Sequence, residues 1–428
     1  MLPRLRKRRK RNRMVKIHCL GGCLEVGRNA FLIESKSKVM LDYGAKVETG
    51  ETPMMPKTRV DALFITHGHL DHLGLAPYLH KKTNCKVYST APTYDFSNLL
   101  LRDSLKVAKI KQRRTYFSPA DILSMNKNYS KIQYGDDTKI GDVTIETLDA
   151  GHVPGSAIFV AKTEGKKILY TGDFNLNPTR LVHGAHLDTK NVDAVIMENT
   201  YSSRDHPSRD EQEKELFKTM KETIENGGVA LLPTFAVRAP ELLMILHHFG
   251  ADFPIYLDGM AKDALTIMLD HPEFLRNPKA LHDAADKAIK LYENDERNNA
   301  MKDPCAIITT GGAMEGGPIV HYMKTLYARE DSSILLTGFQ IPKTAGRYLA
   351  DTGRYIVGAI DFKVKMQMKQ FDFSAHAGRS ELIKFVQKVR PEKLIAVHGE
   401  YCEKFATEMK GRFGIQTYAP QVGDIIKV

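Results

Sequence analysis

The feature that most constrains this chain is the run HGHLDH at positions 67–72, in which four of six side chains can bind metal ions. It directly follows DALFIT (61–66), an apolar segment with the length and composition of a buried strand. Residues two apart in an extended chain point the same way, so His67 and His69 can reach one metal ion. Asp71 and His72 begin the next helix and can present a second set of ligands. Imidazole suits zinc, and a carboxylate can help hold a second ion, so the run predicts a metal centre.

Further ligands are expected where other strands end, because four ligands cannot complete a site for two metal ions. Several apolar segments end in a polar residue, among them KKILYTGD (166–173), AVIMENTY (194–201) and KLIAVHGE (393–400). Each such residue taken alone is equally consistent with a turn or a cap. Their number and order favour a site built along one sheet edge. The candidates are Asp42, His152, Asp173, Glu198, His376 and His398.

The chain predicts an α/β fold with a unit inserted into a first domain. Residues 14–205 are dominated by short strand patterns. From residue 206 a long charged helical pattern is followed by strands that alternate with helices, which is typical of a parallel sheet. A pattern of short strands and turns resumes near residue 365. We therefore expect an inserted unit at 206–364, with 14–205 and 365–428 together forming the first domain.

Charge is concentrated at the N-terminus. The net charge is +11, but residues 1–13 hold eight lysines and arginines and no acid. Without them 54 basic residues face 51 acidic ones, a net charge of +3. We expect residues 1–13 to be disordered in isolation, because they cannot bury apolar surface. They are either a non-specific phosphate contact or the product of an upstream start site, with Met14 beginning the folded protein.

Composition indicates a cytoplasmic globular protein. No apolar run approaches the roughly 20 residues that cross a bilayer, and no apolar signal segment begins the chain. The five cysteines are scattered and odd in number. Cys19 and Cys23 could form half of a metal knuckle, but no second pair follows at ligand spacing. Buried thiols in a reducing cytoplasm explain the cysteines better.

The ordered set of Asp42, the HGHLDH run, His152 and Asp173 resembles the metallo-β-lactamase superfamily. Glu198, His376 and His398 are similar to motifs A, B and C of its β-CASP nucleases. The segments DFSAHA and VHGE most resemble the cleavage and polyadenylation specificity factor nucleases, in a short archaeal form without KH domains. RNase J is the close alternative, although its motif B usually reads Ser-Gly-His. The resemblance implies an αββα sandwich with an inserted α/β β-CASP domain.

This resemblance also implies a chemistry. His67, His69 and His152 would bind one zinc ion, and Asp71, His72 and His398 would bind a second, with Asp173 bridging both. Asp42 would orient a ligand histidine. A hydroxide activated by the two metals would attack an RNA phosphodiester, leaving 5′-phosphate and 3′-hydroxyl ends. His376, held by Glu198, would protonate the departing 3′-oxygen. Because DNA-repair relatives typically carry valine at motif C, His398 favours RNA.

The inserted unit departs from the family pattern where it would grip RNA. Arg238 is displaced by one position, and Gly312 stands where serine is common. The functional interpretation is a set of phosphate contacts, and the alternative is solvated arginines and ordinary turn glycines. The proposed contacts are Arg238, Gly316, Gly317, Lys343, Arg347 and Ser374.

The leading expectation is a zinc-dependent ribonuclease that cuts single-stranded RNA internally, with 5′-to-3′ trimming as well. A small-molecule hydrolase with the same metal core is an alternative that the long insertion disfavours. A non-catalytic RNA-binding scaffold is another, and the complete ligand set disfavours it. Relatives often form homodimers, and an RNA-processing or decay complex is a further expected setting.

Overall fold

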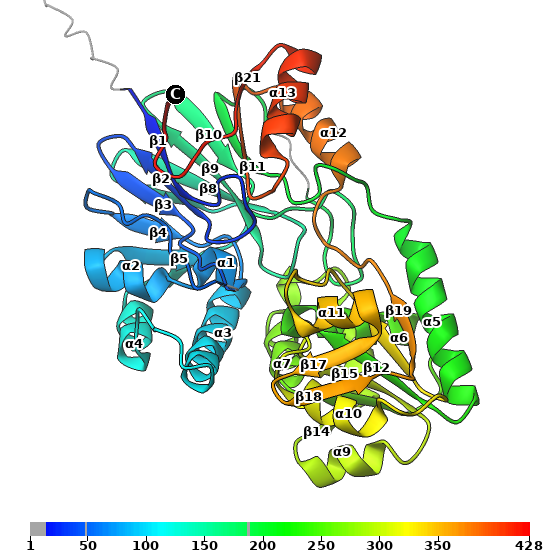
Figure 1. The fold of residues 1–428 in the computed structure, drawn as a ribbon. Coiled ribbons are helices and arrows are strands. Elements are labelled where there is room, and N and C mark those ends of the chain that lie inside the picture. The colour runs from blue at the N-terminus through cyan, green and yellow to red at the C-terminus, as the bar shows by residue number, and fades with distance from the viewer. Residues whose placement is uncertain (1–13, 48, 186–188) are drawn as a thin grey trace, which may run out of the picture.

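The computed structural model describes residues 14–47, 49–185 and 189–428 and contains three large β-sheets (Figure 1). Two seven-stranded sheets pack face to face with helices outside them, and a six-stranded sheet forms a separate unit. The expected αββα sandwich with an inserted α/β unit is confirmed. The basic residues 1–13, which we expected to be disordered, lie outside the described residues.

The first sheet of the sandwich has the strand order β22-β1-β2-β3-β4-β5-β6. Its pairs are antiparallel from β22 to β3 and parallel from β3 to β6. The strands are β1 (Lys16–Gly21), β2 (Ala30–Glu34), β3 (Lys38–Leu41), β4 (Ala62–Phe64), β5 (Lys86–Ser89), β6 (Tyr129–Lys131) and β22 (Ile425–Lys427). Short connections join β1 to β2 and β2 to β3, a long segment joins β3 to β4, and helices join β4 to β5 and β5 to β6.

The second sheet has the order β21-β20-β11-β10-β9-β8-β7. It is antiparallel from β7 to β10 and parallel from β10 to β21. The strands are β7 (Asp137–Ile140), β8 (Val143–Asp149), β9 (Ala157–Thr163), β10 (Lys166–Tyr170), β11 (Ala194–Glu198), β20 (Lys393–Val397) and β21 (Gln416–Tyr418). Strands from before and after the inserted unit therefore form this one sheet.

The two sheets enclose one apolar core, to which Ile17, Phe31, Phe159 and Ile196 contribute fully buried side chains. Helices cover the outer faces of both sheets and bury a second apolar layer on each. These helices are α1 (Leu70–Leu73), α2 (Ala76–Thr83), α3 (Ala91–Ile110), α4 (Pro119–Lys127), α12 (Arg379–Val389) and α13 (Cys402–Phe413). Close packing on both faces of each sheet therefore holds the ends of the strands in fixed positions.

The third sheet is parallel throughout, with the order β14-β13-β15-β12-β16-β19. Its central strands are buried along their whole length, as expected of a parallel sheet covered on both faces. The strands are β12 (Val229–Thr234), β13 (Ile255–Asp258), β14 (Ala288–Leu291), β15 (Cys305–Thr310), β16 (Ser333–Leu336) and β19 (Gln367–Gln370). The alternating strand and helix pattern of the sequence thus predicted this sheet correctly.

Helices cover both faces of the third sheet. Helices α5 to α8 pack on one face and α10 and α11 on the other, beside the hairpin of β17 and β18. The remaining elements are α5 (Arg209–Glu225), η1 (Ala236–Arg238), α6 (Ala239–His248), α7 (Ala261–Asp270), η2 (Pro272–Phe274), α8 (Pro278–Asp286), α9 (Asn294–Ala300), α10 (Pro318–Leu326), α11 (Ala345–Thr352), β17 (Arg354–Val357) and β18 (Ile360–Lys363).

The chain crosses between the sandwich and the inserted unit twice, once between β11 and α5 and once between β19 and α12 (Figure 1). The boundary expected at 364/365 lies too early, because β19 still pairs in parallel with β16 of the third sheet. The second crossing therefore follows Gln370. The two parts also touch where α3 packs against α7 and Asp95 pairs with His271 at 2.6 Å.

Candidate metal centre and its proton donor

The predicted ligands lie together where the strands of the sandwich end. His67 follows β4, His152 follows β8, and Asp173 follows β10. His398 follows β20, while Asp71 and His72 lie in α1. Because the carboxyl ends of these strands meet at one edge, residues more than 300 positions apart in the chain share a site.

A first ligand group consists of His67, His69, His152 and Asp173. His67 Nε2 lies 2.9 Å from His69 Nδ1, and His152 Nε2 lies 3.3 Å from the same Nδ1. Asp173 Oδ2 is 3.5 Å from His67 Nε2. The donor atoms of this group all lie within 4.8 Å of one another, so one ion can reach all four.

A second ligand group consists of Asp71, His72, Asp173 and His398. His398 Nε2 lies 3.2 Å from Asp71 Oδ2, and His72 Nε2 lies 3.3 Å from Asp173 Oδ2. Asp173 belongs to both groups, and its two oxygens face different histidines: Oδ1 is 3.1 Å from His398 Nδ1. Its position is that of a carboxylate that could bridge two ions.

The chemistry of these side chains fits metal ions. Burial and neighbouring histidines lower the pKa of His67 and His152 well below the ordinary value, and burial lowers the pKa of His69 to about 4. These rings are therefore neutral, as metal ligands must be. Asp173 is buried and pairs only with histidines among the described residues, without a lysine or arginine. A buried carboxylate in that setting is suited to a cation.

Asp42 orients His72. This buried carboxylate accepts hydrogen bonds from His72 Nδ1 at 2.7 Å, from Thr66 N and Oγ1 at 2.7 and 2.8 Å, and from the Tyr170 hydroxyl at 2.8 Å. The bond to Nδ1 directs Nε2 of His72 toward the second group. The sequence pointed to Asp42 but missed Thr66 and Tyr170. Both are polar residues at the ends of strands, the same signal that identified the ligands.

A backbone carbonyl orients His152. The Nδ1 atom of His152 lies 2.8 Å from the carbonyl oxygen of Ala375, and this contact turns Nε2 toward the first group. Ala375 belongs to the loop between β19 and α12, which also carries His376. We define this loop, residues 372–378, as the motif B loop. No sequence signal identifies a carbonyl as a partner, because every residue has one.

His376 and Glu198 form a pair beside the ligand groups. Nδ1 of His376 lies 2.9 Å from Glu198 Oε2 and 3.1 Å from Oε1, and 3.9 Å from Asp173 Oδ2. Burial alone would lower the pKa of His376, but the Glu198 and Asp173 carboxylates raise it above the ordinary value. Glu198 is itself fixed by the Phe174 amide at 2.8 Å and the Thr200 hydroxyl at 2.6 Å. Because Nδ1 is held by Glu198, Nε2 is the ring nitrogen of His376 left for other partners.

Arg238 contacts a carboxylate and the backbone of the motif B loop, and its predicted phosphate-binding role stays a prediction. Its guanidinium pairs with Glu241 at 2.6 Å and donates to the carbonyl of Phe373, and Nη1 is buried. Ser374, the other predicted contact near the centre, lies in the motif B loop, and its hydroxyl accepts from the His376 amide at 3.2 Å. Both residues thus contact the loop that carries His376.

The remaining predicted phosphate contacts lie on the surface of the inserted unit. Gly316, Gly317, Lys343 and Arg347 are all exposed, and Gly317 precedes α10. Arg347 forms a 2.8 Å ion pair with Asp351 one turn along α11. These residues lie in loops at the carboxyl edge of the parallel sheet and in α11 beside it. Their phosphate-binding role stays a prediction.

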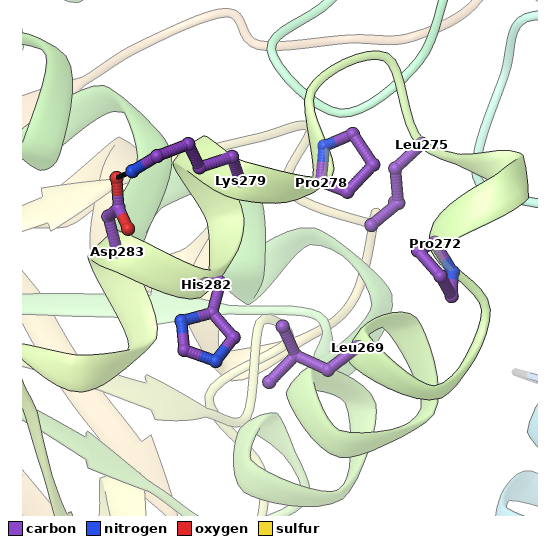
Figure 2. Close-up of a pocket in the computed structure, with 7 residues that line it drawn as sticks. All are labelled: Leu269, Pro272, Leu275, Pro278, Lys279, His282 and Asp283. Atoms are coloured by element: carbon purple, nitrogen blue, oxygen red, sulfur yellow. Dashed lines mark hydrogen bonds and ion pairs between the residues drawn. The ribbon is translucent and has the colours of Figure 1, made fainter.

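A separate hollow of about 530 Å³ lies between α7 and α8 in the inserted unit. Figure 2 shows Leu269, Leu275 and the prolines on one side, with the Lys279–Asp283 ion pair at its rim. His282, at its edge, pairs with Asp286 at 3.2 Å. The hollow brings together no group of metal ligands among the described residues.

Among the helices of the described residues, none is both long and apolar enough to cross a bilayer.

Three family models match successive parts of the chain. The Metallo-beta-lactamase superfamily domain matches residues 32–201, and the Beta-Casp domain matches residues 239–349. The model described as Zn-dependent metallo-hydrolase RNA specificity domain matches residues 361–420. Together they cover both parts of the sandwich and the inserted unit between them.

Similar proteins match along nearly their whole length. The chain is 37% identical to "Probable RNase MJ4" of Methanocaldococcus jannaschii, over 95% of this chain and 99% of the relative. It is 32% identical to "RNase aCSPSF2" of Saccharolobus solfataricus, over 96% of this chain and 84% of the relative. A crystal structure of a protein of unknown function from Enterococcus faecalis V583 has the same fold, with a TM-score of 0.62 at 15% identity, over 97% and 100% of the two chains.

Proposed function

Because this chain belongs to the Beta-Casp branch of the metallo-β-lactamase superfamily, we propose that it is a zinc-dependent ribonuclease acting in RNA processing or decay. Relatives that match over most of their length carry the name RNase. The match over residues 361–420 to an RNA specificity domain supports RNA as the substrate class. The reaction is hydrolysis of a phosphodiester bond.

The two ligand groups would hold two zinc ions. His67, His69 and His152 would bind one, Asp71, His72 and His398 the other, and Asp173 both. Imidazole and carboxylate ligands in these numbers suit zinc. When bound, the ions would lower the pKa of water and offset negative charge on the phosphoryl oxygens. Asp42 and the Ala375 carbonyl would keep two of the ligand rings in their binding orientation.

His376 would supply the proton that the departing 3′-oxygen requires. Glu198 holds Nδ1, so Nε2 is the atom that can donate. The two nearby carboxylates raise the pKa of the ring above its ordinary value, which favours the protonated form that an acid needs. The products would be a 5′-phosphate and a 3′-hydroxyl. The pair of His376 and Glu198 beside Asp173 is the observation that carries the proposal. A hydrolase that relied on its metal ions alone would not need a separate proton donor.

The test uses single-stranded RNA labelled at either end. We expect cleavage by the zinc-loaded protein, loss of cleavage with chelator, and recovery on adding Zn²⁺. His376→Ala should reduce the rate of cleavage by about 10²–10⁴-fold without loss of bound zinc. His282→Ala, which alters an exposed histidine in the separate hollow, is the matched control and should cleave normally. Absence of cleavage by the zinc-loaded protein would contradict the proposal.

The positions of the labels also separate internal cutting from trimming. An internal cut converts a 5′-labelled RNA into a labelled fragment of intermediate length, whereas 5′-to-3′ trimming releases the label as a mononucleotide. We propose internal cutting as the principal mode, with RNase J-like trimming as the alternative. A cytoplasmic location is in keeping with the five cysteines, which are all buried and unbridged. A homodimer, common among relatives, would be seen by light scattering.

A further inference from the structure

Three consecutive carbonyls of the motif B loop are each held by a nitrogen donor from elsewhere in the fold. Arg238 donates to Phe373 O, Arg209 Nη1 to Ser374 O at 3.4 Å, and Ala375 O is 2.8 Å from His152 Nδ1. The next residue is His376. Two of the three donors belong to the inserted unit, so that unit contacts the loop directly ahead of the proton donor.

Glu241 links the two arginines. Its carboxylate pairs with Arg209 through Oε1 and with Arg238 through Oε2, the latter at 2.6 Å. Only 2% of the Glu241 side chain is exposed, against 20% and 15% for the arginines. Burial alone would raise the pKa of Glu241, but Arg209 and Arg238 lower it, so the group is ionised. Arg209 also stacks on Phe373 of the loop, with its guanidinium 5.4 Å from the ring centroid.

These contacts join the adjacent elements η1 and α6 to the start of α5 and to a loop 135 residues beyond Arg238. Arg209 begins α5, Arg238 ends η1, and Glu241 lies in the first turn of α6. A buried carboxylate needs its cationic partners, and hydrogen bonds from charged donors to carbonyls are stronger than neutral ones. The cluster is therefore rigid where it meets Phe373 and Ser374.

We propose that Arg209, Glu241 and Arg238 form a positioning cluster that sets the place of the motif B loop and thereby of His376. They act through the loop backbone and do not touch RNA. This inference rests on the proposed role of His376 as proton donor. It also gives Arg238 a different role from phosphate binding, since its Nη2 is engaged with Glu241 and Phe373.

The first test compares Arg238→Ala with Arg297→Ala. Arg297 is a matched control, because it belongs to the same unit, is 14% exposed and pairs with the buried Asp258 at 2.6 Å, but has no contact with the loop. Arg238→Ala should lower kcat for RNA cleavage by about 10–100-fold with little change in KM, as expected for a displaced reacting group. Arg297→Ala should leave both constants unchanged. A phosphate ligand would instead raise KM.

Conservative replacement and a double variant make the test specific. Arg238→Lys keeps the charge and one donor and should recover part of kcat. In the His376→Ala background, Arg238→Ala should have no further effect on kcat, because both act through the same proton transfer. A further loss of the full size in that background would overturn the inference.

A readout independent of cleavage separates this inference from the proposed function. Hydrogen exchange at the amides of residues 374–378 should be about 10-fold faster in Arg238→Ala and unchanged in Arg297→Ala, because the loop opens more readily. Unchanged exchange in Arg238→Ala would refute the positioning cluster even if RNA proved not to be the substrate. If exchange is faster in Arg238→Ala and unchanged in Arg297→Ala, but the wild-type protein does not cleave RNA, the result would count against the ribonuclease proposal alone.

Discussion

At the scale of single residues, the proposed role of His376 depends on the charge beside it. Glu198 and Asp173 raise its pKa against the opposing effect of burial. An acid must be protonated to act, so a raised pKa extends activity toward higher pH, and activity falls as pH passes above that value.

Replacing Glu198 by Gln should therefore move the alkaline limb of the kcat profile to lower pH. Removing one adjacent negative charge should lower the pKa of His376, because Glu198 is one of the carboxylates that raise it. The measurement is kcat against pH for wild type and Glu198→Gln, with zinc content checked for both. An alkaline limb that stays in place would mean that a different group limits the rate at high pH.

Asp42 is a second residue whose effect reaches the metal through a histidine. Asp42→Asn keeps the shape but loses the charge that holds His72 Nδ1. The zinc affinity should fall by about 10–100-fold. Competition with a chelating dye measures this change. Thr66→Val, which removes one of the hydroxyl donors to Asp42, should have a smaller effect in the same assay. Equal affinities for Asp42→Asn and wild type would exclude the orienting role.

At the scale of elements, the packing of α1 against the segment after β3 fixes two ligands. A Cβ atom at Gly44 would lie 1.7 Å from the carbonyl oxygen of Asp71, on the backbone of α1 itself. Helix α1 is only four residues long and cannot absorb the clash without moving Asp71 and His72.

Gly44→Ala should therefore destabilise the protein by about 1–3 kcal/mol and weaken zinc binding. Gly411→Ala is the matched control, because Gly411 lies in helix α13 and a Cβ there meets nothing within 4 Å. That change should stabilise the protein by about 0.5–1 kcal/mol. Denaturant unfolding of both variants gives the two signs. Equal stabilities for the two would contradict the packing described for α1.

The elements also show what the sequence could predict. The HGHLDH run, together with polar residues that follow apolar strands, pointed to each residue of the two groups that the structure brings together. Helix α3 begins at Ala91, where Pro92 suits the first turn. The boundary at 365 failed because β19 has the sequence QMKQ and lacks the apolar pattern of a strand. The place of Arg238 depends on Glu241 and on Phe373, 135 residues away, so no local pattern could reveal it.

At the scale of the whole molecule, the metal ions should contribute to stability. The ligand groups bring together five histidines and two carboxylates from distant segments. When no cation is bound, the two negative carboxylates and the lone pairs of the ligand atoms lie close together and repel one another. Ligands that bind only the folded state stabilise it by about 4 kcal/mol at 1,000 times their dissociation constant.

Chelation should therefore lower the temperature at which the sandwich unfolds by several degrees, and added Zn²⁺ should restore it. Differential scanning calorimetry with and without chelator measures the shift. His69→Ala, which removes a ligand of the first group, should show a smaller difference between the two conditions. If chelation leaves the unfolding temperature of the wild-type protein unchanged, the sites do not hold metal tightly.

The two crossings between the sandwich and the inserted unit have one more consequence. Glu198 ends β11 at the first crossing, and His376 lies in the second, between β19 and α12. The hydrogen bond between them thus links the two crossings. A displacement of the inserted unit that pulled the crossings apart would break this bond, and through the Ala375 carbonyl it would also release His152. The histidine of the second crossing and a ligand of the first group are therefore held in place together, by the same passage of the chain.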